Sequence, residues 1–237
     1  MNEQNTALVT GGGRGIGKET AILLAKMNLN VIICSRTQAD IDSVIEETKK
    51  MGNNKVMGKK CDVSRSDDVN ALVKGILDEY GKIDILINNA GITYIKILVD
   101  TTEDEWDRTL DINLKGVFLF CKAIIPHMIM NNFGVVINVS SGAGKVGFEN
   151  LSAYCASKFG MMGLTESLAW EVANSNIRAM TICPGEVATN MQENADPQYF
   201  ELNKHRMLNP QVVARKIVEM VVDNKKYRNG DSVDLPN

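Results

Sequence analysis

The chain has 237 residues, of which 44% are hydrophobic and 23% are charged, as is ordinary for a soluble globular protein. Its net charge of −3 argues against binding nucleic acid or an anionic membrane by general electrostatics. The start, MNEQNTALVT, lacks the pattern of a signal peptide, and no run is predicted to be apolar enough to span a membrane, so a cytoplasmic protein is expected.

Short β-branched runs alternate with longer stretches of helical spacing along the chain. Strands are predicted at residues 6–10, 30–34, 54–60, 83–88, 134–140, 177–183 and 232–235. Helices are predicted at residues 15–27, 39–51, 66–80, 103–130, 154–175 and 209–223. The strands are continuous apolar runs, as expected when both faces are buried. This pattern predicts an α/β, Rossmann-type doubly wound fold with about seven mostly parallel strands and helices on both faces.

Capping residues support two of the predicted helix starts, and one irregular segment is predicted to be a lid. Thr102 with Glu105 forms a possible capping box, and Asn209-Pro210 offers an N-cap followed by proline at the first helical position. No linker or repeat divides the chain, so residues 1–237 are predicted to form one domain. The irregular segment 186–208 is long for a connection and is interpreted as a substrate lid within that domain.

The cysteines and histidines offer little material for a metal site. The five cysteines are widely spread without a CxxC pair, and they are predicted to be small buried hydrophobic residues. His127 and His205 are the two histidines of the sequence. Neither a zinc site nor a histidine-based catalytic triad is therefore expected, and the prediction is that no metal is bound.

A glycine-rich turn joins the first predicted strand to the first predicted helix. It reads TGGGRGIG at residues 10–17. Glycines let the backbone turn tightly and approach a ligand, and the helix N-terminus offers N–H groups to a pyrophosphate. A glycine-rich turn without a ligand is the alternative, but the position after the first strand of a doubly wound pattern favours dinucleotide binding.

The end of the second strand favours NADP over NAD as the cofactor. An NAD-preferring fold usually has an acidic residue there to bind the ribose 2′-hydroxyl. Here the sequence reads Cys34-Ser35-Arg36-Thr37, without an acid. Arg36, together with Arg14 of the glycine turn, has the guanidinium shape that suits a 2′-phosphate. The alternative is that both arginines are solvated surface charges.

An ordered set of motifs follows the glycine turn. It comprises CDV (61–63), NNAG (88–91), Asn113 in LDINLKG, Ser141 in INVSSGAG, YCASK (154–158) and PGEVAT (184–189). Ser141 lies 13 residues ahead of Tyr154. This set resembles the short-chain dehydrogenase/reductase family over nearly the whole chain, and in particular the bacterial 3-oxoacyl-carrier-protein reductases. The resemblance implies an NAD(P)-dependent oxidoreductase that acts on carbonyl or CH–OH groups.

The resemblance also implies which residues contact the cofactor. Asp62 and Val63 would line the adenine, the NNAG motif would pass beside the cofactor, and Val187 with Thr189 would hold the nicotinamide amide. Asp62 as a helix cap and NNAG as an ordinary turn are the alternatives. The full expected set is Gly11, Gly13, Arg14, Gly15, Ile16, Ser35, Arg36, Asp62, Val63, Asn89, Ala90, Gly91, Tyr154, Lys158, Val187 and Thr189.

Tyr154 is the candidate proton donor for ketone reduction. Lys158 follows it by four residues and shares its helical face, so its ammonium is expected to lower the pKa of the phenol. Ser141 can donate a hydrogen bond to the substrate oxygen, whereas chemistry alone does not separate it from Ser140. Asn113 is assigned by the resemblance to a proton relay and to a local helix break.

Cys155, between the candidate tyrosine and lysine, has no neighbour placed by the sequence to activate it. It is therefore interpreted as a packing residue rather than a nucleophile. An amphipathic surface pair is the alternative interpretation of Tyr154 and Lys158, and the accompanying motifs argue against it.

The substrate is less well determined than the reaction. Where a carrier-protein reductase is expected to have basic docking residues, this chain has Asn131, Asn132 and Ser175, and Lys122, Lys145 or Arg178 are the alternative docking cations. The predicted pocket residues are Tyr94, Gly142, Phe148, Leu151, Glu186, Met191 and Met207.

Three functions are left open by these residues. A reductase of ketones or 3-oxoacyl thioesters leads, and an oxidative dehydrogenase of a sterol, sugar or hydroxy acid is the alternative. An inactive cofactor sensor is the third. The broad apolar surfaces of helices 103–130 and 154–175 predict a homodimer or homotetramer.

Overall fold

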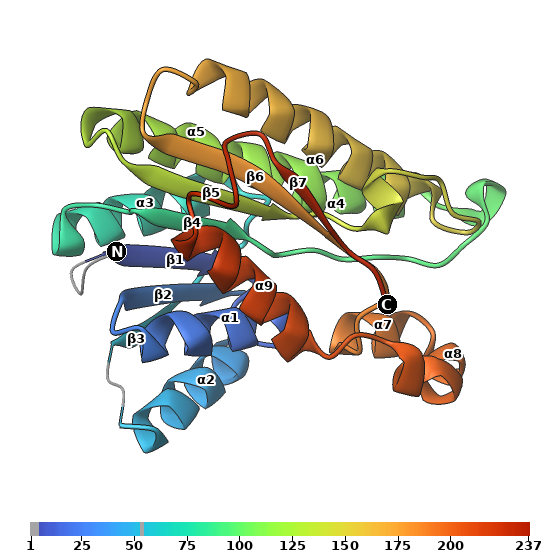
Figure 1. Cartoon of the computed structure of the whole chain (residues 1–237). Coiled ribbons are helices and arrows are strands. Elements are labelled where there is room, and N and C mark those ends of the chain that lie inside the picture. The colour runs from blue at the N-terminus through green and yellow to red at the C-terminus, as the bar shows by residue number, and fades with distance from the viewer. Residues whose placement is uncertain (1–4, 53–54) are drawn as a thin grey trace.

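The computed structural model describes residues 5–52 and 55–237, and these form one seven-stranded sheet in which every neighbouring pair is parallel (Figure 1). The order is β3-β2-β1-β4-β5-β6-β7. The strands are β1 (Thr6–Thr10), β2 (Asn30–Ser35), β3 (Val56–Lys60), β4 (Ile85–Asn88), β5 (Gly134–Val139), β6 (Ile177–Pro184) and β7 (Ser232–Leu235). The predicted doubly wound fold is confirmed. The predicted strand start at residue 54 and the first four residues lie outside the described ranges.

Three helices cover each face of the sheet (Figure 1). One face carries α1 (Gly15–Lys26), α2 (Gln38–Lys50) and α9 (Pro210–Val222), and the other carries α3 (Ser66–Tyr80), α5 (Gly116–Met130) and α6 (Ser152–Glu171). Successive strand side chains point to opposite faces. Thus Ala7 and Val9 join one buried cluster while Leu8 joins the other. Burial on both faces explains why these strands are continuous apolar runs.

The predicted helix at residues 103–130 is interrupted. Helix α4 (Glu103–Leu110) leads into a π-helical stretch, η2 (Asp111–Lys115), before α5 begins at Gly116. The Gly116 N–H bonds the Asp111 carbonyl five residues back. The local break expected near Asn113 is therefore present as this π-helical stretch, a form that often occurs at functional sites.

Residues 103–130 correct the expectation that no run of this sequence is apolar enough to span a membrane. Residues Glu103–Met130 contain an 18-residue window with a mean hydropathy of 1.4, so they meet the length and composition of a membrane span. Half of that window is buried within the fold. Residues such as Val117, Phe120 and Ile124 pack in the core beside Leu86 and Val136 of the sheet. Burial against the sheet explains this apolar composition without a membrane.

Caps fix the helix starts that the sequence predicted. Thr102 accepts from the Glu105 N–H at 3.2 Å while the Glu105 carboxylate accepts from the Thr102 N–H at 3.1 Å, which confirms the capping box. Asn209 caps α9 by accepting from the Gln211 N–H at 2.8 Å. The N-cap of α3 is Arg65, so Asp62 does not cap that helix.

The segment predicted as a lid contains short helices. These are α7 (Asn190–Ala195), α8 (Pro197–Asn203) and the 3-10 turn η4 (Lys204–Arg206). A β-bridge between Val187 and Leu208 joins the two ends of the segment. Two further 3-10 turns are η1 (Leu98–Asp100) and η3 (Gly142–Gly144).

Candidate functional site

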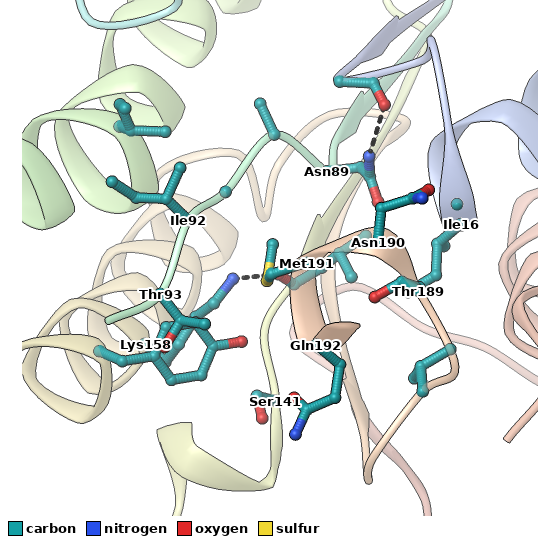
Figure 2. Close-up of a pocket in the computed structure, with 18 of the residues that line it drawn as sticks. Ile16, Asn89, Ile92, Thr93, Ser141, Lys158, Thr189, Asn190, Met191 and Gln192 are labelled. Carbon is teal, nitrogen blue, oxygen red and sulfur yellow. Dashed lines mark hydrogen bonds between the residues drawn. The ribbon is translucent and has the colours of Figure 1, made fainter. Parts of the chain in front are cut away.

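A cavity of about 620 Å³ opens at the carboxyl ends of the strands, next to the point where the strand order reverses between β1 and β4. Open parallel sheets bind ligands at such a switch point. Figure 2 shows Ile16 and Asn89 toward one end of this cavity and Lys158 and Ser141 toward the other. Met191 and Gln192 of α7 lie between them. The cavity volume suits a small-molecule or cofactor site.

The glycine turn after β1 forms one wall of the cavity. Gly11 has a φ of +62°, and a Cβ there would lie 2.9 Å from the Ala90 Cα. A Cβ on Gly17 would lie 2.4 Å from the Gly11 carbonyl oxygen. Glycine is thus required for the turn to close against the NNAG segment, because any side chain would clash with backbone.

Thr10 and Asn89 lock the two motifs together. The Thr10 Oγ1 accepts from the Asn89 N–H at 3.0 Å and from the Ala90 N–H at 3.1 Å. In return, the Asn89 Nδ2 donates to the carbonyls of Thr10 at 3.0 Å and Gly11 at 3.1 Å. NNAG is therefore more than a connecting turn, since the Asn89 side chain and the N–H groups of Asn89 and Ala90 hold the glycine turn.

The start of α1 suits a phosphate group. Its N-cap, Arg14, makes no side-chain capping bond, and its first turn carries no acidic residue. The N–H groups of the first turn and the positive end of the helix dipole then remain to receive an anion. The residues present thus fit a dinucleotide's pyrophosphate.

The part of the cavity near the glycine turn and the end of β2 has charges of both signs. Arg14 and Arg36 line it and are exposed, and Asp40 and Asp62 line it as well. Although burial acts to raise the pKa of Asp62, hydrogen bonds from Ser64 lower it overall. Asp62 Oδ1 accepts from the Ser64 hydroxyl at 2.7 Å, which fixes the loop after β3. Asp40 was missed by sequence reasoning because it lies inside α2 rather than at the strand end.

Tyr154, Lys158 and Ser141 meet in the same cavity. Lys158 Nζ lies 5.5 Å from the centre of the Tyr154 ring and donates to the Val139 carbonyl at 2.8 Å. The pKa of Tyr154 is raised to about 12 by burial, against a lowering hydrogen bond to Ser141. The expected lowering of this pKa by Lys158 is thus wrong for the protein alone, because burial dominates. Burial also lowers the pKa of Lys158 to about 8.

Asn113 lies behind the cavity wall rather than on it. Its Oδ1 accepts from the Ile92 N–H at 2.8 Å, and its Nδ2 donates to the Ile92 carbonyl at 2.9 Å and to the Ser157 hydroxyl at 3.0 Å. Ser157 in turn donates to the Tyr154 carbonyl at 2.7 Å. Asn113 therefore joins the loop after β4 to α6. Ser157, within the quoted YCASK motif, was missed as the link.

The structure separates the two adjacent serines. Both serines line the cavity, but the hydroxyl of buried Ser140 donates to the Lys158 carbonyl at 3.4 Å, whereas Ser141 is the serine that contacts Tyr154. Cys155 is buried, and its sulfur accepts from the Phe148 N–H at 3.4 Å, which agrees with a packing role. All five cysteines are buried and free, as predicted.

Most of the predicted site residues line the cavity. Gly13 and Asn113 are the exceptions among the cofactor and catalytic sets. Of the predicted pocket residues, Phe148, Leu151, Glu186 and Met191 line it. Tyr94, Gly142 and Met207 do not. The prediction that these three line the pocket is wrong; Met207, for example, is buried directly after η4. The lining residues that sequence reasoning missed include Thr93, Glu149, Asn150, Gln192, Asp196 and Tyr199.

Two of the three candidate docking cations make other contacts, whereas Lys122 is exposed beside the ring of Phe118. The Arg178 guanidinium donates to the carbonyls of Met220, Val221 and Tyr227 at 2.7–2.9 Å, so it holds the end of α9 and is wrong as a docking residue. Lys145 pairs with Asp234. Among the described residues, no group of three or more His, Cys, Asp or Glu side chains is arranged to hold a metal ion.

Comparison with known proteins places the chain in a family. The short chain dehydrogenase family profile matches residues 5–199. The 3-oxoacyl-(acyl-carrier-protein) reductase FabG of Thermotoga maritima is 34% identical over 98% of this chain and 96% of its own length. A 3-oxoacyl-(acyl-carrier-protein) reductase of Synechocystis is 36% identical over 92% of this chain and 89% of its own. The chain belongs to the short-chain dehydrogenase/reductase family.

Solved structures share the fold closely. Levodione reductase matches with a TM-score of 0.92 and 29% identity over 98% of this chain and 96% of its own. A variant of actinorhodin polyketide ketoreductase, solved with NADPH, matches with a TM-score of 0.92 and 27% identity over 100% of this chain and 98% of its own. These neighbours and the family support an oxidoreductase that acts on carbonyl or CH–OH groups.

Proposed function

We propose that the protein is an NADPH-dependent reductase that converts a ketone or 3-oxoacyl substrate to a secondary alcohol. The observation that carries the proposal is that Tyr154, Ser141 and Lys158 line the same cavity as the glycine turn. A proton donor, an oxygen-binding hydroxyl and a dinucleotide cradle thus share one space. The reductases and ketoreductases among the similar proteins support this reaction class.

Each side chain takes a role that its contacts allow. When bound, NADPH supplies the hydride. Tyr154 donates its proton to the developing alkoxide, and its raised pKa keeps the phenol protonated at neutral pH. Ser141, in contact with the tyrosine, donates a hydrogen bond to the substrate oxygen. Lys158 places a positive charge near the phenol ring and favours the phenolate that remains after transfer.

Asn113 acts as a positioning residue in this proposal. Its bonds to Ile92 and Ser157 hold the loop after β4 against the helix that carries Tyr154. The π-helical stretch places Asn113 there by shifting the helix register. A proton relay through water near Lys158 is a further part of the proposal, carried by the family resemblance.

The cofactor is proposed to be NADP rather than NAD. Arg14 and Arg36 line the adenosine end of the cavity with exposed guanidinium groups, which suit a 2′-phosphate. The strand end at Ser35 lacks the acid that would bind a 2′-hydroxyl. The other proposed contacts, besides the glycine turn, are Ile16, Ser35, Asp62, Val63, Asn89, Ala90, Gly91, Tyr154, Lys158, Val187 and Thr189, all of which line the cavity.

We further propose one soluble, cytoplasmic domain with residues 186–208 as its substrate lid, assembled as a homodimer or homotetramer.

The second candidate function is an oxidative dehydrogenase of a sterol, sugar or hydroxy acid, because the same residues catalyse the reverse reaction. An inactive cofactor sensor is the third.

A substrate panel separates these functions. NADPH absorbance should fall with ketones or 3-oxoacyl thioesters for the reductase, and NADP⁺ should be reduced faster by alcohols for the dehydrogenase. Tight NADPH binding without turnover of any carbonyl or alcohol in the panel would instead indicate the sensor.

A further inference from the structure

The cations and the acids that line the cavity lie on different segments of the chain. Arg14 and Arg36 lie at the glycine turn and just after β2, whereas Glu149, Glu186 and Asp196 lie in the loop before α6 and in the lid segment. The third lining cation, Lys158, is buried and donates to a backbone carbonyl. A substrate whose carbonyl reaches Tyr154 therefore presents its remaining groups to an acidic wall.

Glu186 is the acid of this wall whose position is best fixed. It follows directly on Gly185 at the end of β6. Its carbonyl accepts from the Leu208 N–H at 2.8 Å, and the Ala188 N–H donates to the Leu208 carbonyl at 2.9 Å. These two bonds, one on either side of the Val187–Leu208 bridge, tie the backbone of Glu186 to the far end of the lid segment.

Tyr199 of α8 fixes the carboxylate of Glu186. Its hydroxyl lies 2.9 Å from Glu186 Oε1 and 3.2 Å from Oε2, so it donates to the carboxylate across the lid. Asp196 accepts from the Tyr199 N–H at 2.9 Å and caps the helix that carries the tyrosine. Glu186 is exposed, but hydrogen bonds hold both its backbone and its carboxylate in place.

We propose that Glu186, held by Tyr199, is a specificity-determining residue that selects ketones with a neutral or cationic group beside the carbonyl and rejects those with a carboxylate or phosphate there. The inference rests on the proposed reductase function. A fixed carboxylate accepts further hydrogen bonds from a donor but repels an anion bound beside it. The substrate class is therefore neutral or basic hydroxy- or amino-ketones and esters, not anionic acids.

The test compares two substrates that share one carbonyl, ethyl 3-oxobutanoate and free 3-oxobutanoate. For the native protein, kcat/KM for the ester should exceed that for the acid by about tenfold or more. Glu186→Gln keeps the shape of the side chain and removes its charge. The ratio of the two kcat/KM values should then fall to within about threefold, because kcat/KM for the acid rises. Glu193→Gln changes an exposed acid of α7 outside the cavity and should leave the ratio unchanged.

A binding measurement keeps the inference independent of turnover. Calorimetry of the protein–NADPH complex with ethyl 3-hydroxybutanoate and with 3-hydroxybutanoate should show the same preference and the same narrowing in Glu186→Gln. Tyr199→Phe should reduce this preference for the ester in part, because the Glu186 carboxylate loses the hydrogen bond that fixes it. An equal ratio in native protein and Glu186→Gln, or a native preference for the anion, would overturn the role of Glu186. Failure of every ketone to oxidise NADPH would overturn the reductase proposal, while the binding ratio would still decide Glu186.

Discussion

The burial of the Lys158 side chain disfavours its charged form. Its side chain is 3% exposed, and burial lowers its pKa from 10.5 to about 8. A shift of this size corresponds to at most about 3 kcal/mol of cost for holding the charged form in the fold. Near neutral pH this cost is present in full. The proposed catalytic role explains why a lysine stands there.

Lys158→Met should therefore stabilise the protein while it abolishes reduction. The expected gain is about 1–3 kcal/mol, since the lost bond to Val139 offsets part of it. Between pH 8 and 10.5 the native fold binds fewer protons than the unfolded chain, so the stability of the native protein rises with pH. The extra stability of Lys158→Met over the native protein therefore shrinks across this range. Urea unfolding at pH 7 and pH 10 measures this. Lys50→Met, on an exposed helix end, is the control, and a Lys158→Met protein less stable than the native one would contradict the account.

Arg36→Asp should exchange the cofactor preference. The change removes a guanidinium that suits the 2′-phosphate and adds a charge that repels it. The ratio of kcat/KM with NADPH to that with NADH is expected to fall by about 100-fold or more. Arg65→Asp, also exposed but outside the cavity, should leave the ratio unchanged. An unaltered ratio in Arg36→Asp would show that this arginine does not face the phosphate.

Some site residues could be predicted from local sequence motifs, and others could not. Tyr154, Lys158 and Ser141 were predictable because their motifs are short and fall at strand ends or on one helix face. Tyr199 was not, because its contact with Glu186 joins residues thirteen apart through a lid whose path the sequence pattern does not give. The pKa of Tyr154 was mispredicted because burial, which outweighs the neighbouring charge, is a property of the whole fold.

At the scale of elements, the turn from β1 into α1 depends on tight glycine packing. Gly17→Ala should place its methyl group against the Gly11 carbonyl and the Asn89 amide, so the turn must open. The expected loss of stability is about 2 kcal/mol or more, with weaker NADPH binding. Denaturant unfolding and fluorescence titration measure the two effects.

Gly75→Ala provides the matched control for this prediction. Gly75 lies exposed inside α3, with nothing within 4 Å of the added methyl group. Alanine there should stabilise the protein by about 0.5–1 kcal/mol through helix propensity. If Gly17→Ala behaved like Gly75→Ala, the close approach of the turn to NNAG would be wrong.

The elements themselves were largely predictable, since strands and helices occur in the predicted order with ends shifted by a few residues. The π-helical stretch was not visible as periodicity, because one inserted hydrogen-bond step leaves the apolar pattern of 103–130 nearly unchanged. The short helices α7 and α8 were missed because they bury few side chains and so show no apolar face.

At the scale of the molecule, two helices keep large apolar groups at the surface. Phe159 and Trp170 of α6 are 45% and 77% exposed, and Phe118 and Ile129 of α5 are 45% and 52% exposed. Residues eleven apart lie within about 20° of one another around a helix, so each pair shares a face. Such faces are expected to pack against another copy of the chain.

A double variant tests this assembly. The native protein should sediment as a dimer or tetramer at micromolar concentration, and Phe159→Arg with Trp170→Arg should yield a smaller species. Met27→Arg, at a partly exposed methionine on the opposite face of the sheet, should not change the mass. A native protein that sediments as a monomer would exclude the proposed oligomer.

The most direct measurement for the whole account is NADPH oxidation by Tyr154→Phe with a ketone that the native protein reduces. Removing a general acid should lower kcat by about 100-fold or more. The dissociation constant for NADPH should stay within about threefold, because the ring and Lys158 remain in place. A variant that keeps a tenth or more of the native kcat would contradict the role of Tyr154 as proton donor.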